Sequence, residues 1–99
     1  MKLVSITRTP SERKEFKAIF NKDGKEYIRR FGTASNYVLN SNKTDADRDA
    51  YRKRHRAMKA EAKALNDPMS PAALSMYVLW GDSRSLSKNI TAFKRRFNL

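Results

Sequence analysis

The spacing of the apolar residues changes once along this 99-residue chain, and that change restricts the fold more than any other feature. In the first third, apolar side chains recur at every second position, as in Phe16, Ala18 and Phe20. This is the spacing of a strand with one buried face. The Asp-Gly pair that follows favours the tight turns of hairpins. The sequence therefore predicts a hairpin over Lys14–Phe31, preceded by a separate strand over Leu3–Thr9.

Beyond residue 43 the apolar spacing becomes helical. Thr44 can cap a first helix, because its hydroxyl can accept a hydrogen bond from a backbone N–H of the first turn. This helix should run to about Leu65, where an Asn-Asp-Pro sequence ends it. One face of the predicted helix carries apolar or amphipathic side chains at regular spacing: Tyr51, His55, Met58, Ala62 and Leu65.

Two further helices are expected in the C-terminal third. Ser70–Pro71 supplies a cap and a first-turn proline, and Gly81 provides the stop. Ser83 or Ser85 should cap the last helix, which runs through Phe97. Its apolar residues form a single stripe at helical spacing: Leu86, Ile90, Phe93 and Phe97.

Together these elements predict one α+β domain over residues 1–99, β-rich in residues 1–32 and helical in 44–97. An N-terminal β-hairpin or small antiparallel sheet should pack against two to three helices. The segment Gly32–Asn42 is small and polar around a few apolar residues. It is expected to be a linker whose apolar side chains dock on the core.

The net charge of the chain limits the kinds of molecule that it is expected to bind. It has 22 lysines and arginines against 10 acidic residues, a formal net charge of +12, and basic residues outnumber acidic ones in every third of the chain. Such a charge costs self-repulsion and favours polyanions. Nucleic acid is the expected partner of a small basic domain, although an anionic membrane or an acidic protein surface would satisfy the same electrostatics. The chain has no cysteine and no apolar run long enough for a signal peptide or a membrane span.

The basic residues of the first predicted helix share one face. In a continuous helix they would form a row about 22 Å long beside the apolar face: Arg48, Arg52, Arg56, Lys59 and Lys63. Two further basic clusters lie next to aromatic residues: Arg29 and Arg30, and Arg95 and Arg96. All nine are candidate nucleic-acid-binding residues. The alternative is a solvated helix face, although such faces usually carry acidic residues in similar numbers.

No catalytic, metal or cofactor site is expected. His55 is the only histidine, and its place on the apolar face favours a hydrogen-bonded boundary residue over a catalyst. Asp45, Asp47 and Asp49 alternate as in a calcium loop, but the glycine and glutamate of that loop are missing. Roles at the positive end of the helix dipole and in capping are favoured. Two further acidic residues at helix boundaries also indicate caps: Asp67 and Asp82.

Tyr77 and Trp80 could stack on nucleobases or form a protein contact. Their neighbours in ALSMYVLWG are strongly apolar, so a core position is favoured for both. Exposure of the two rings would instead indicate a patch that docks on another protein.

The order of short motifs in residues 30–97 resembles a family of short basic proteins encoded by large DNA viruses of eukaryotes. Their sequences follow the pattern FG…D..R..Y..RH…DP…S..LLW…S…I…K.RF. The residues of this chain that carry the resemblance include Phe31-Gly32, Tyr51 to His55, Asp67-Pro68-Met69, Ala73-Leu74-Ser75, Leu79-Trp80-Gly81, Ser85-Leu86, Asn89-Ile90 and Lys94 to Phe97. The resemblance implies a viral origin and supplies no catalytic residues.

The function expected from these observations is non-catalytic, sequence-nonspecific nucleic-acid binding, of DNA more than RNA. With the resemblance, the expected setting is the virion or the cytoplasm or nucleus of an infected cell. The alternative is a minor capsid or core component that binds acidic surfaces of other viral proteins. In that alternative Tyr77 and Trp80 would lie in the contact.

Overall fold

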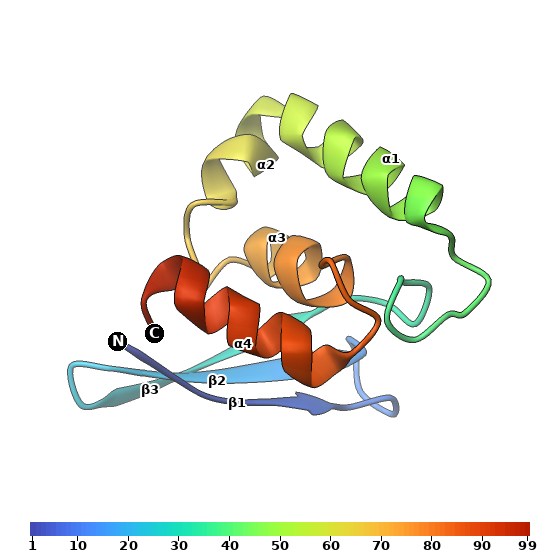
Figure 1. Cartoon of the computed structure of the whole chain (residues 1–99). Helices are drawn as coiled ribbons and strands as arrows, with labels where there is room; N and C mark the ends of the chain where they lie inside the picture. Colours follow the sequence, from blue (N-terminus) through green and yellow to red (C-terminus); the bar gives the residue numbers. More distant parts are fainter.

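The computed structural model describes all residues, 1–99, and shows a three-stranded sheet with every helix on one of its faces (Figure 1). The α+β architecture expected from the sequence is therefore confirmed. In chain order its elements are β1 (Lys2–Arg8), β2 (Phe16–Lys22), β3 (Lys25–Phe31), α1 (Asp45–Ala57), α2 (Lys59–Ala64), α3 (Pro71–Leu74), η1 (Ser75–Leu79) and α4 (Leu86–Phe97). The η1 segment is a π-helical continuation of α3.

The predicted hairpin forms as β2 and β3, and β1 adds to β2 in the antiparallel order β1-β2-β3. The turn between β2 and β3 places Asp23 at φ 54° and Gly24 at φ 77°. Both values lie in the left-handed region that two-residue hairpin turns require, which explains the Asp-Gly pair. A β-bulge interrupts the register between Leu3 and Ser5.

The core lies between the sheet and the helices. The period-two residues of β2 are fully buried, and Phe31 of β3 stacks on Phe16 with ring centroids 5.7 Å apart. The core cluster is completed mainly from the helices and the segments that flank them: Tyr37, Leu74, Val78, Leu79, Trp80 and Phe93. Docking of the segment before α1 is confirmed by Tyr37, which is buried and donates from its hydroxyl to Asp45 at 2.5 Å.

The helix expected from Thr44 to Leu65 is wrong in one respect: the chain leaves the helix at Met58. That residue has extended backbone angles, φ −83° and ψ 113°, and separates α1 from α2. Met58 is 47% exposed and so does not belong to the buried face. The bend has a tertiary reason. It turns α2 back toward the rest of the molecule (Figure 1), where Leu65 is buried, while Tyr51 of α1 stacks on Trp80.

The predicted helix caps are confirmed where they depend on local sequence. Thr44 and Asp47 form a reciprocal capping box at the start of α1. Ser70 caps α3 with Pro71 in its first turn, and Ser85 caps α4. Asp67, also expected to be a cap, is not one: its carboxylate accepts a hydrogen bond from the backbone N–H of Met69 in the turn before Ser70. None of the helices is both long and apolar enough to cross a membrane.

Candidate anion-binding cleft

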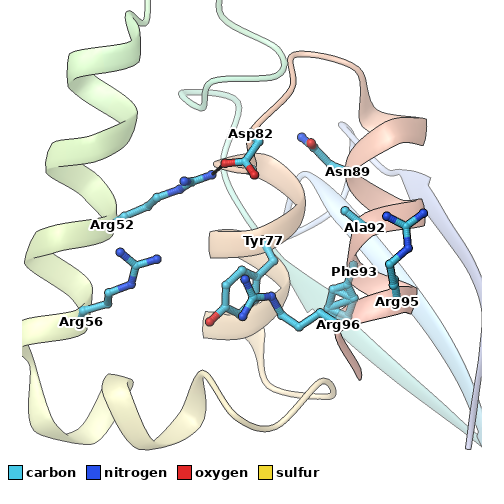
Figure 2. Close-up of a pocket in the computed structure, with 10 residues that line it drawn as sticks. Arg52, Arg56, Tyr77, Asp82, Asn89, Ala92, Phe93, Arg95 and Arg96 are labelled. Carbon is cyan, nitrogen blue, oxygen red and sulfur yellow. Dashed lines mark hydrogen bonds and ion pairs between the residues drawn. The ribbon is translucent and has the colours of Figure 1, made fainter. Parts of the chain in front are cut away.

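A cleft of about 480 Å³ lies between α1, η1 and α4. Four of its ten lining residues are arginines: Arg52 and Arg56 from α1, Arg95 and Arg96 from α4. Figure 2 shows Arg52, Arg56 and Arg96 reaching into the space between the two helices, whereas Arg95 runs up along α4 beside Ala92. The remaining lining residues are Tyr77, Gly81, Asp82, Asn89, Ala92 and Phe93. The fold thus brings together two basic clusters that are about 40 residues apart in the sequence. We call this hollow the arginine cleft.

Asn89 fixes the inner wall of the arginine cleft. Its buried side-chain amide donates to the carbonyls of Val78 (2.8 Å) and Ser83 (2.6 Å), and its oxygen accepts from the Ser83 N–H (3.0 Å). These bonds join η1, the following loop and α4. Gly81 lies so close that an added Cβ would be 2.7 Å from the Asn89 side chain. A glycine is therefore required here by close packing.

The guanidinium of Arg52 is occupied by hydrogen bonds within the protein. Its Nε donates to the Trp80 carbonyl at 2.7 Å, and its Nη2 donates to Asp82 Oδ1 at 2.9 Å. The hydrogen bond from Arg52 lowers the pKa of Asp82 below its ordinary value. Asp82 therefore does not cap a helix in the expected way. It holds α1 to the loop before α4.

The guanidinium of Arg48 is also occupied by contacts within the protein. It lies 5.0 Å from the Tyr37 ring centroid and donates to Asp49 and to the Asp82 carbonyl. Because α1 has no buried residue, contacts such as these fasten it to the body of the protein. The first two arginines of the predicted row are thus largely occupied by structural contacts.

The other three arginines of the cleft keep their donors free. Arg56 and Arg95 are exposed and take part in no hydrogen bond or ion pair within the chain. Arg96 lies with its Cζ 4.1 Å from the centroid of the Tyr77 ring and leaves its N–H groups unpaired. The end of the cleft that these residues line therefore carries uncompensated positive charge. The Arg52–Asp82 end is internally neutralised.

The remaining predicted cations lie elsewhere. Lys59 and Lys63 belong to α2, beyond the break at Met58, so the continuous row of about 22 Å expected from one helix does not exist. Arg29 lies 5.6 Å from the Tyr27 ring on the sheet. Arg30 forms an ion pair with Glu12. Of the nine candidates, the arginine cleft unites Arg52, Arg56, Arg95 and Arg96.

The aromatic residues divide between core and cleft. Trp80 is buried and stacks on Tyr51 with centroids 4.3 Å apart and planes at 6°, so its predicted core position is confirmed. Tyr77 packs partly against the core and also lines the cleft. His55 is half-buried at the boundary as expected, beside the Tyr51 ring and in contact with the Glu61 carboxylate. No local pattern in the sequence indicates that Tyr77 would face the arginines.

The chain contains no group of three or more His, Cys, Asp or Glu side chains that could hold a metal ion. Comparison with protein-family models, with curated proteins and with solved structures finds no match. The case for function therefore depends on the cleft and its charge.

Proposed function

We propose that this protein is a non-catalytic, sequence-nonspecific nucleic-acid-binding protein that holds phosphates in the arginine cleft. The observation that carries the proposal is the convergence of arginines from α1 and α4 on one hollow (Figure 2). On the resemblance described above, we further propose that the nucleic acid is viral and that binding occurs in the virion or infected cell.

The chemistry of the cleft suits phosphate. A guanidinium presents donors in a planar fork that matches two phosphate oxygens, and such charge-assisted bonds are stronger than neutral ones. Arg56 belongs to α1 and Arg95 to α4, so a strand that lies across the cleft could contact both helices. Phosphate contacts carry no sequence information, which accounts for the nonspecific binding that we propose.

A pair of charge-reversal variants tests the proposal. Arg56→Glu combined with Arg95→Glu should weaken binding to a fluorescent DNA by about 100-fold, and similarly for unrelated sequences. The matched control is Lys59→Glu with Lys63→Glu, which makes the same charge change on α2. We expect the control to lose less than about 5-fold. Equal losses in both variants would show that the binding depends on overall charge alone.

Arg52 is unsuitable for this test because its bonds to Trp80 and Asp82 hold α1 in place. Polyglutamate, added as a competitor, examines the alternative of an acidic protein partner. Weak competition is expected, because duplex DNA carries one charge per about 1.7 Å of its axis and extended polyglutamate only one per about 3.3 Å, so polyglutamate releases fewer counterions on binding. If polyglutamate displaced DNA at equal charge concentration, an adaptor that binds acidic protein surfaces would be favoured instead.

A further inference from the structure

One wall of the arginine cleft has a feature that phosphate binding does not need. The Tyr77 ring carries the Arg96 guanidinium 4.1 Å from its centroid and contacts the edge of Phe97 with centroids 5.8 Å apart. The ring, with the guanidinium over its face, lies at the side of a cationic hollow. Both aromatic rings and guanidinium planes are surfaces on which unpaired nucleobases stack.

The Tyr77 hydroxyl adds a polar group to this wall. It makes no hydrogen bond within the chain, and Figure 2 shows it on the side of the ring that faces α1, below Arg56. The hydroxyl oxygen is accessible to solvent, since no side-chain oxygen is buried without a partner. The group is free to donate to, or accept from, an occupant that lies beside the ring and the guanidinium.

The size and shape of the cleft limit the occupant. A volume of about 480 Å³ is within the ordinary range for sites that enclose a small ligand or part of a larger one. In a duplex the bases are stacked on one another and present only their edges, in the grooves, so a duplex offers the cleft phosphates but no base face on which to stack. A single strand can place a phosphate and an unstacked base in the same hollow.

We propose that the occupant of the arginine cleft is single-stranded nucleic acid, with one base stacked on the Tyr77–Arg96 unit. Phosphates on either side of that base bind Arg56 and Arg95. This inference rests on the proposed function and specifies the form of nucleic acid that it concerns. The Arg52–Asp82 end of the cleft is already neutralised, so the strand is held at the opposite end.

The test compares a labelled 12-nucleotide single strand with the 12-base-pair duplex of the same sequence at 100 mM salt. The single strand should bind the unmodified protein at least about 10-fold more tightly. Tyr77→Leu should weaken single-strand binding by about 10-fold, as loss of one stacking ring does, and leave duplex binding within about 2-fold. Tyr77→Phe keeps the ring and is the matched control, with a single-strand affinity within about 3-fold of the original.

Arg96→Lys provides a second variant that keeps the charge and removes the planar group. It should weaken the single strand more than the duplex, so the inference is testable even if Tyr77→Leu unfolds the protein. Equal affinity for both forms, with equal effects of the variants, would overturn the inference and leave phosphate binding intact. Absence of binding to either form would overturn both this inference and the proposed function.

Discussion

At the scale of single residues, Asn89 is the side chain on which the cleft depends most. Its amide makes three hydrogen bonds and is 2% exposed. Asn89→Ala would leave the buried Val78 carbonyl without a partner, a cost of about 1–3 kcal/mol, and would also remove the bonds to the half-buried backbone groups of Ser83. We expect the free energy of unfolding in urea to fall by about 2–4 kcal/mol.

Lys88→Ala is the matched control for that measurement, since Lys88 is the exposed neighbour of Asn89 on α4. It should change the free energy of unfolding by less than about 0.5 kcal/mol. A loss below about 1 kcal/mol in Asn89→Ala would mean that water replaces the amide, and that the wall of the cleft is looser than its hydrogen bonds indicate.

The residue scale is also where prediction from sequence was weakest. Arg52 and Arg56 are one helical turn apart on the same face. Arg52 has Asp49 three residues before it and Arg56 has no acidic residue at helical spacing, but this local difference does not predict the partners that Arg52 takes. The structure separates their roles because Asp82, 30 residues after Arg52, arrives beside Arg52 and not beside Arg56. Tertiary contacts therefore decide which arginines keep free donors for a ligand. The helical spacing of basic residues in the sequence does not show those contacts.

At the scale of elements, prediction succeeded where a signal is local. The Asp-Gly turn, the Thr44, Ser70 and Ser85 caps and the apolar stripe of α4 each depend on a few adjacent residues. The break at Met58 does not. Its segment is rich in helix-forming residues, and the bend forms because Tyr51 and Leu65 pack against different parts of the molecule.

The start of α1 should be sensitive to acid. The backbone N–H and the hydroxyl of Thr44 donate to the Asp47 carboxylate, and these bonds lower the pKa of Asp47 below its ordinary value. A group with a lowered pKa in the folded state stabilises the fold above its ordinary pKa. That stabilisation is lost as the pH falls through the folded-state pKa, which for aspartate means below about pH 4.

Asp47→Asn tests this acid sensitivity, because asparagine has no proton to gain in that range. We expect the melting temperature of the unmodified protein to fall more between pH 6 and pH 3 than that of the variant, and the two curves to converge at the acid end. Melting followed by circular dichroism would measure the difference. Parallel curves over the whole range would show that the capping box does not contribute to the pH dependence.

At the scale of the whole molecule, the net charge of +12 could attract a polyanion over the entire surface or mainly in the arginine cleft. Much of the charge is spread over the sheet and α2, and some of it is paired, as in Arg30 with Glu12. The cleft contributes three arginines with free donors: Arg56, Arg95 and Arg96. Binding at three arginines releases few counterions, whereas a polyanion that contacts the whole basic surface releases many.

The salt dependence of binding separates these two cases. Three phosphate contacts to a single strand give a slope of about −2 in a plot of log affinity against log salt concentration. Affinity should then fall by about 20-fold between 50 and 200 mM salt. Arg56→Gln should make the slope shallower by about 0.7, because one contact is lost, whereas Lys59→Gln should not change it. A slope of about −7, altered equally by both variants, would mean that the polyanion wraps the whole basic surface and that the arginine cleft holds no special share of it.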